Sequence, residues 1–211
     1  MGVMKAKWII ILAPAISSFL FFLPLNSQAQ WNVGLEYNMT FPFTDYGEVF
    51  NTGSNFNFEA KYHFNKGWGI GFQIGAARFA DSKEGISFGR TDPKLTVVPI
   101  LLVVEYETER EGIVRPFFAA GLGMSTYTFS YYAGRSVNET STSITISPQM
   151  GVRFFIAKNT MCYLKGSYVF VMNGLPLVSY PNLPAIIFPV SGEATGYAGI
   201  AIGFCYRYDS R

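Results

Sequence analysis

The residues that could do chemistry in this chain are one histidine, two cysteines and a scattered set of charged side chains. His63 is the only imidazole, the group that most often serves as a general base. A hydrolase using His63 would need a serine beside it and a carboxylate to orient the ring, but no serine lies near His63 in the sequence. A metal centre would need several further ligands, and the sequence contains no His/Cys cluster. The sequence therefore predicts a protein that is not an enzyme, with no catalytic residue, no metal and no cofactor.

The elements that must position these residues are strands with one apolar and one polar face. Across residues 31–41 every odd position is apolar or aromatic, and every even position is polar or glycine. Successive side chains of a strand point to opposite faces, so this alternation indicates a strand with two unlike faces. Pro99 cannot donate to a strand ladder, so we expect a bulge or a bend there. Alternation of this kind predicts eight strands, at about residues 31–41, 54–64, 68–76, 95–107, 115–129, 144–154, 162–170 and 193–208.

Composition and connection lengths indicate that the apolar faces meet lipid. The chain is 49% apolar and 17% aromatic, yet after residue 29 no apolar run is long enough for a membrane-spanning helix. Connections after the second, fourth and sixth strands are short. The others are longer and include a Ser/Thr/Asn loop after the fifth strand, an asymmetry typical of outer-membrane barrels. We predict an all-β, eight-stranded antiparallel up-and-down transmembrane β-barrel; the alternative is a secreted soluble sandwich or lipocalin-like barrel.

Strand parity assigns a set of charged and polar side chains to the lumen of this barrel. Eight strands leave an interior just wide enough for side chains to fill. Because an unpaired buried charge is costly, we expect opposite charges there to pair and plug the lumen. The alternative is a narrow path for ions or solutes between the pairs. The predicted lumen residues are Glu36, Glu59, Lys61, His63, Glu105, Gln149, Arg153, Lys165 and Arg207.

The two cysteines lie near the ends of neighbouring strands, where a disulfide is conceivable in an oxidising compartment. With Lys165 inward, Cys162 faces lipid, and with Arg207 inward, Cys205 faces the lumen. Side chains on opposite faces do not satisfy disulfide geometry, so we predict two free thiols.

The first 29 residues read as a signal peptide, with residues 30–211 forming the barrel domain. Lys5 and Lys7 precede the apolar stretch Trp8–Leu25, and Ser27-Gln28-Ala29 offers small residues for cleavage. Of the 16 Lys and Arg, these two lysines leave with the peptide, so the mature chain matches its 14 Asp and Glu with as many cations. A neutral chain lacks the basic face that a nucleic-acid partner would need.

Aromatic side chains cluster at the predicted strand ends, where a membrane barrel carries its interfacial girdles. The short-turn side offers Trp31, Tyr62, Trp68, Tyr106, Tyr206 and Tyr208, with Phe64 and Phe154 beside them. The other girdle is predicted from Phe41, Phe56, Phe129 and Phe170.

Three segments resemble a known family. Val98–Leu102 with Glu105-Tyr106, followed by Arg115–Gly123, is similar to the paired strands of the outer-membrane β-barrel domain family of Gram-negative bacteria, of the PorT-like type. Ile202–Tyr208 resembles the aromatic final strand that such proteins present to the barrel insertion machinery. The resemblance implies an integral outer-membrane protein whose partners are outer-membrane lipid and, during assembly, that machinery.

The last long loop, residues 172–192, is unusually apolar for an exposed segment. It either folds over the barrel mouth or dips into the outer leaflet, or it is a contact site for a partner protein or an apolar ligand. The candidate contact residues are Leu175, Leu177, Tyr180, Leu183, Ile186, Ile187 and Phe188. We therefore expect a structural or interaction barrel. A narrow channel for small or apolar solutes is the alternative, and a lipid-modifying enzyme is disfavoured because no triad is present.

Overall fold

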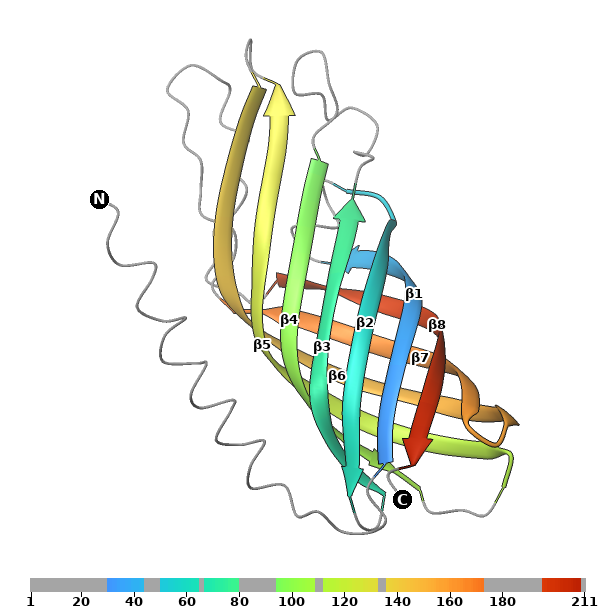
Figure 1. Ribbon diagram of the computed structural model, residues 1–211. Helices are drawn as coiled ribbons and strands as arrows, with labels where there is room; N and C mark the ends of the chain where they lie inside the picture. The colour runs from blue at the N-terminus through green and yellow to red at the C-terminus, as the bar shows by residue number, and fades with distance from the viewer. Residues whose placement is uncertain are drawn as a thin grey trace.

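Eight antiparallel strands form a closed barrel in the computed structural model of the chain (Figure 1). The structure describes residues 30–43, 50–64, 67–79, 94–108, 112–132, 136–172 and 195–209. The predicted signal peptide, residues 1–29, lies outside these ranges. The strands are β1 (Gln30–Phe43), β2 (Gly53–Phe64), β3 (Trp68–Phe79), β4 (Lys94–Glu107), β5 (Val114–Tyr132), β6 (Ser136–Ala157), β7 (Thr160–Val171) and β8 (Thr195–Asp209).

Each strand pairs with the next in sequence, and β1 pairs with β8 to close the barrel. This closing seam runs without a break from the pair Gln30↔Asp209 to the pair Phe43↔Gly196. The all-β, eight-stranded up-and-down prediction is therefore confirmed. Among the described residues there is no helix long and apolar enough to cross a membrane.

The two faces of the sheet are those that the alternation predicts, with large apolar side chains outside and polar ones inside. On β1, Leu35 is 65% exposed while its neighbour Glu36 is 3% exposed. Phe204 on β8 is 61% exposed. In a protein dissolved in water this distribution would be inverted, because large apolar side chains would be buried and charges solvated. The barrel wall is thus built to face hydrocarbon.

Near one end of the barrel the outward face changes from apolar to polar on five strands. The first outward polar residues on β2 to β6 form what we call the polar border: Ser54, Arg78, Thr96, Thr126 and Thr142. This is the end with the long connections 44–52, 80–93 and 172–194, and the opposite end carries the short connections 65–67, 108–113 and 158–159.

The predicted Ser/Thr/Asn loop after the fifth strand is wrong, because this segment is strand. β5 continues to Tyr132 and β6 begins at Ser136, so the β5–β6 hairpin extends past the other strands (Figure 1). Threonine is β-branched and suits a strand as well as a loop. The hydroxyl oxygens of Thr126 and Thr142 lie 3.4 Å apart.

Three further expectations need correction. Phe129 points inward with buried Tyr127, because odd-numbered residues of β5 face the lumen. Tyr62 belongs to the outer face but is only 5% exposed, since its ring packs 5.2 Å from that of Trp31. Pro99 produces no bulge. The β3–β4 register is the same before and after it, from Ile74↔Ile100 to Ala77↔Val97, and only the β3–β4 bridges between these two pairs are missing.

Candidate functional site

The structure brings all nine predicted lumen residues into the interior of the barrel. Each is 7% exposed or less, so the side chains fill the space that they line. They come from six of the eight strands, β1, β2, β4, β6, β7 and β8, and their inward direction follows from the two-residue period of each strand. The charged members, together with Glu107, form a continuous set of ion pairs that we call the charge network.

Glu105 on β4 is the centre of the charge network. One carboxylate oxygen lies 2.7 Å from Lys61 Nζ, and the other lies 2.5 Å from an Arg153 nitrogen. Both charged partners are 1% exposed or less. His63 Nε2 lies 3.5 Å from Glu105, so the single imidazole belongs to the same cluster.

A second group continues the charge network toward the middle of the barrel. Lys61 also contacts Glu59 at 2.8 Å, and Lys165 Nζ lies 2.5 Å from Glu36. The Tyr163 hydroxyl donates a hydrogen bond to Glu36 over 3.0 Å. Lysine charges therefore alternate with carboxylates from β1, β2 and β7, so that each buried charge lies beside an opposite one.

Glu107 anchors the short-turn end. Its carboxylate accepts hydrogen bonds from Arg153, from Arg207 at 3.2 Å and from Arg115 at 3.2 Å. The Arg153 guanidinium also lies 4.3 Å from the centre of the Phe117 ring, a cation–π contact. Planar guanidinium groups suit this end because each offers several fixed donors to carboxylates.

Toward the long-loop end the interior becomes neutral and then apolar. Gln73 donates to Glu36 at 3.2 Å, and Gln149 donates to Gln73 at 2.9 Å. The Thr145 hydroxyl donates to Ser125 at 2.7 Å. Beyond these residues the lumen is closed by a buried apolar and aromatic cluster: Phe50, Ala77, Phe79, Leu95, Val97, Tyr127, Phe129, Val169, Val171 and Tyr197.

The buried charges of the network balance. The four carboxylates Glu36, Glu59, Glu105 and Glu107 face four buried cations, Lys61, Arg153, Lys165 and Arg207. Arg115 adds a fifth, partly exposed cation at the short-turn end. The buried set leaves no surplus charge in the interior to attract an ion.

His63, Glu105 and Glu107 are the described residues closest to a metal site, since their ligand atoms lie within 4.8 Å of one another. Both carboxylates already bind lysine or arginine side chains. A divalent cation would have to displace these partners, so the donor set favours ion pairing over metal binding.

Several interior residues were not among the predicted site residues. These residues are Glu107, Tyr163, Asn57, Gln73 and Phe117. The inward parity of their strands was the available signal. It does not reveal that Tyr163 reaches Glu36, because this contact passes over Gly203 of β8, the strand that separates β7 from β1.

The remaining predicted residues lie on the outer surface or outside the described chain. Trp68, Tyr106, Tyr206 and Tyr208 are exposed on the outer wall at 47%, 36%, 53% and 60%, and the rings of Trp68 and Tyr106 are 5.1 Å apart. The predicted contact residues of loop 172–192, from Leu175 to Phe188, lie outside the described residues.

Cys162 and Cys205 are free thiols on opposite faces of the wall, as parity predicts. Cys205 pairs across the β7–β8 ladder with Met161 and not with Cys162. Cys205 is 2% exposed in the interior.

Comparison with known proteins matches the sequence model described as "Outer membrane protein beta-barrel domain" to residues 15–171. No curated protein sequence matches the chain. Among solved structures the chain is similar to Neisserial surface protein A, with 15% identity, a TM-score of 0.56, and coverage of 84% of this chain and 97% of that chain. It is similar to Ail, the attachment invasion locus protein of Yersinia pestis, with 15% identity, a TM-score of 0.53, and coverage of 86% and 99%. A major outer membrane protein from Thermus thermophilus gives 13% identity, a TM-score of 0.56, and coverage of 84% and 99%.

Proposed function

Because the chain belongs to the outer membrane protein β-barrel domain family and is an integral protein of the outer membrane, we propose that it works at its surface, as a closed structural or interaction barrel. The observation that carries this proposal is the charge network. A lumen occupied by neutralised, buried ion pairs offers no route for a solute, so the residues that meet other molecules are those outside it.

The interior argues against a channel at two levels. In the charge network, Arg153 and Glu105 are 0% exposed, so no water-sized passage runs beside them. Nearer the long loops, the apolar cluster around Tyr127 and Tyr197 closes the lumen a second time. An ion would have to lose its hydration shell and break existing ion pairs to pass, at a cost of several kcal/mol.

The interior also argues against a lipid-modifying enzyme. The His63 imidazole is buried inside the lumen against Glu105, whereas lipid lies against the outer wall. A base in this position has no substrate within hydrogen-bond reach. The narrower PorT-like assignment remains a proposal that rests on the strand pair containing Val98–Leu102 and Arg115–Gly123.

Single-protein conductance in planar bilayers tests the closed barrel. We expect no discrete current steps from the purified, refolded protein at neutral pH, under conditions in which a porin of known conductance gives clear steps. Reproducible steps that disappear after proteolysis of the inserted protein would instead establish a channel.

The β5–β6 hairpin is the part of the described surface best placed to meet a partner. It passes the polar border, and Thr140 and Thr142 are exposed on it. β6 bridges β7 only as far as the pair Thr145↔Val171, so on that side residues 136–142 bridge no strand that the structure describes. Such an edge accepts an extended segment of another protein through main-chain hydrogen bonds.

Photo-crosslinking in intact cells tests the interaction role. A benzophenone amino acid in place of Thr140 is expected to form a covalent adduct with another protein, identified by mass spectrometry. The same group in place of Leu122, which is 58% exposed on the lipid-facing wall, is the matched control. Equal protein adducts at both positions, or none at Thr140, would remove the β5–β6 hairpin as a contact site. The apolar loop 172–192 remains a second proposed contact.

A further inference from the structure

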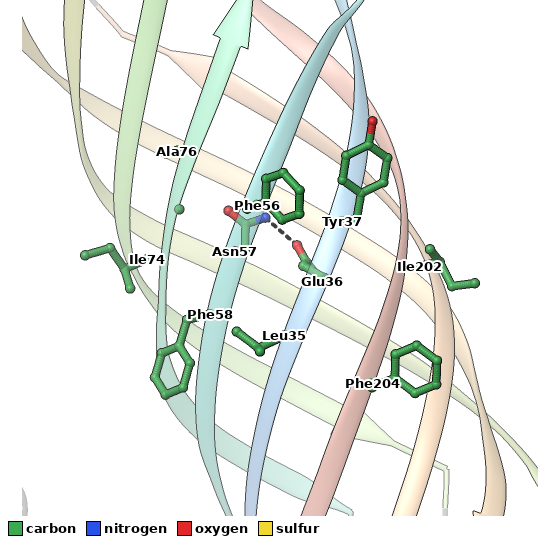
Figure 2. Close-up of a pocket in the computed structure, with 11 residues that line it drawn as sticks. Leu35, Glu36, Tyr37, Phe56, Asn57, Phe58, Ile74, Ala76, Ile202 and Phe204 are labelled. Atoms are coloured by element: carbon green, nitrogen blue, oxygen red, sulfur yellow. Dashed lines mark hydrogen bonds between the residues drawn. The ribbon is translucent and has the colours of Figure 1, made fainter.

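The outer wall carries a groove that the charge network does not explain. It spans β1, β2, β3 and β8 and has a volume of about 560 Å³. Figure 2 shows its bulky walls, among them Tyr37, Phe56, Phe58 and Ile74, around the small side chain of Ala76. These side chains lie on the lipid-facing surface, so hydrocarbon is the medium that fills the groove.

The groove exists because one small residue stands among large ones. Ala76 on β3 is the direct cross-strand partner of Phe56, which in turn faces Tyr37 on β1. The Tyr37 and Phe56 rings lie 5.0 Å apart and form one wall. A rigid barrel wall holds this shape without an ordering cost, which favours occupation by a flexible apolar chain.

Two cations lie beyond the β3 edge of the groove: Arg78, which belongs to the polar border, and Lys94 beside it on β4, a strand that does not line the groove. Arg78 follows Ala76 by two residues on the same face of β3, and it pairs with Ser54 on one side and Thr96 on the other. Lys94 precedes Thr96 by two residues on the same face of β4, which makes it a diagonal neighbour of Arg78 at about 7–8 Å between Cα atoms. Both side chains are exposed, and neither forms an ion pair with a residue that the structure describes.

A ligand that satisfies both features has an anionic head and an apolar tail. Diffuse attraction to an anionic surface would use the two cations but would leave the groove without a role. A second copy of this chain is disfavoured as the occupant, because it would bring like charges together at Arg78 and Lys94. The two cations lie at the long-loop end, which faces the outer leaflet in barrels of this class. The anionic lipid of that leaflet is a phosphorylated, acylated glucosamine disaccharide, lipid A.

We propose that this face of the barrel binds one molecule of lipid A, with a phosphate on Arg78 and Lys94 and one acyl chain in the groove beside Ala76. The phosphate oxygens accept hydrogen bonds from the guanidinium and ammonium groups. The acyl chain replaces loosely packed bulk lipid against Phe56 and Tyr37. The site is independent of the proposed surface interaction of the β5–β6 hairpin.

Titration of the full-length protein in neutral phosphatidylcholine nanodiscs with fluorescent hexa-acylated lipid A tests the proposal. Arg78→Gln and Lys94→Gln are each expected to weaken binding by about fivefold, from the attraction of one basic residue near an anionic lipid surface. Ala76→Phe, which fills the groove, is expected to weaken binding by a similar factor. Arg78→Lys keeps the charge and is expected to retain most of the affinity.

Two matched variants separate the site from general effects. Lys158→Gln removes an exposed cation at the short-turn end, and Leu122→Phe adds an aromatic ring to the lipid face away from the groove. Both are expected to bind like the wild type, and heat-dependent gel mobility verifies that each variant is folded.

Three results would overturn the proposal. Unchanged lipid A affinity of the Ala76→Phe variant would show that no acyl chain binds in the groove. Equal affinity for phosphatidylglycerol would mean that the two cations attract any anionic lipid without selectivity for lipid A. Crosslinked dimers that Ala76→Phe abolishes while lipid A binding stays constant would assign the groove to a second copy of the chain.

Discussion

At the scale of single residues, the stability of the interior depends on charges that have no access to water. Glu105 is 0% exposed and contacts Lys61, Arg153 and His63. Removing one member of a buried pair leaves an uncompensated charge, which costs far more than the pair itself contributes. The charge network therefore behaves as a unit.

Glu105→Gln is expected to lower the free energy of unfolding by about 3–5 kcal/mol, because Lys61 and Arg153 lose a charged partner. Urea unfolding of the protein in lipid vesicles, followed by tryptophan fluorescence, measures the change. Lys61→Met and the double variant complete a double-mutant cycle. The double variant is expected to be less destabilised than the sum of the single variants, and strict additivity would contradict a shared network.

The sequence predicted which side chains enter the lumen but not which of them touch. Parity assigns Lys61 and Glu105 to the interior from their own strands alone. Their contact depends on how far β2 and β4 are staggered across β3, and this stagger depends on the closure of the whole barrel. For the same reason the contact of Tyr163 with Glu36 has no local signal.

At the scale of elements, the β7–β8 pair depends on a glycine covered by an aromatic ring. Tyr163 and Gly203 are direct cross-strand partners. A Cβ atom at Gly203 would lie 2.3 Å from Tyr163 Cζ, closer than real atoms approach. The ring lies over the glycine, and its hydroxyl donates to Glu36.

Gly203→Ala is therefore expected to destabilise the barrel by about 1–3 kcal/mol, because the Tyr163 ring must move within a packed interior. Gly166→Ala on β7 is the matched control, since a Cβ there would meet only the Met150 carbonyl oxygen at 4.0 Å. Urea midpoints of the two variants measure the difference. Equal midpoints would mean that the ring is free to turn aside.

Strand positions and faces were predictable, but some ends were not. Alternation identified β1 to β4 because one face of each is apolar and the other polar. Alternation failed to identify strand beyond the polar border. There the outer face, with Thr126 and Thr142, meets solvent or lipid headgroups and is itself polar, so the strand has no apolar face and its sequence resembles that of a loop. Phe129 was assigned to the outer wall from its residue type, although its parity with inward Gly121 indicated the interior.

At the scale of the whole molecule, closure satisfies every strand edge within the bilayer. Hydrocarbon offers no hydrogen-bond partner to a free backbone N–H or C=O, so a sheet is stable there only when its edges meet. Strand number and loop asymmetry were sufficient to predict this closure. They gave no indication of the apolar cluster at the long-loop end, because its members are spread over several strands and connections.

Ending the chain after residue 194, which deletes β8, is expected to abolish the folded state, because β1 and β7 would each expose a row of unpaired backbone groups to lipid. Loss of the heat-dependent shift in gel mobility and of protease resistance measures this. Deleting residues 131–137 at the tip of the β5–β6 hairpin is the control. It is expected to leave both properties intact, and a truncated chain that still shows the shift would contradict closure by β8.

The seam between β1 and β8 also fixes when the molecule acquires its shape. β1 finds its second neighbour only when β8 is available, since the two pair along their whole length from Gln30↔Asp209 to Phe43↔Gly196. Every shorter nascent intermediate has two open margins and a wall of exposed Leu, Phe and Ile side chains. The closed wall therefore forms cooperatively, because no subset of the eight strands can complete it.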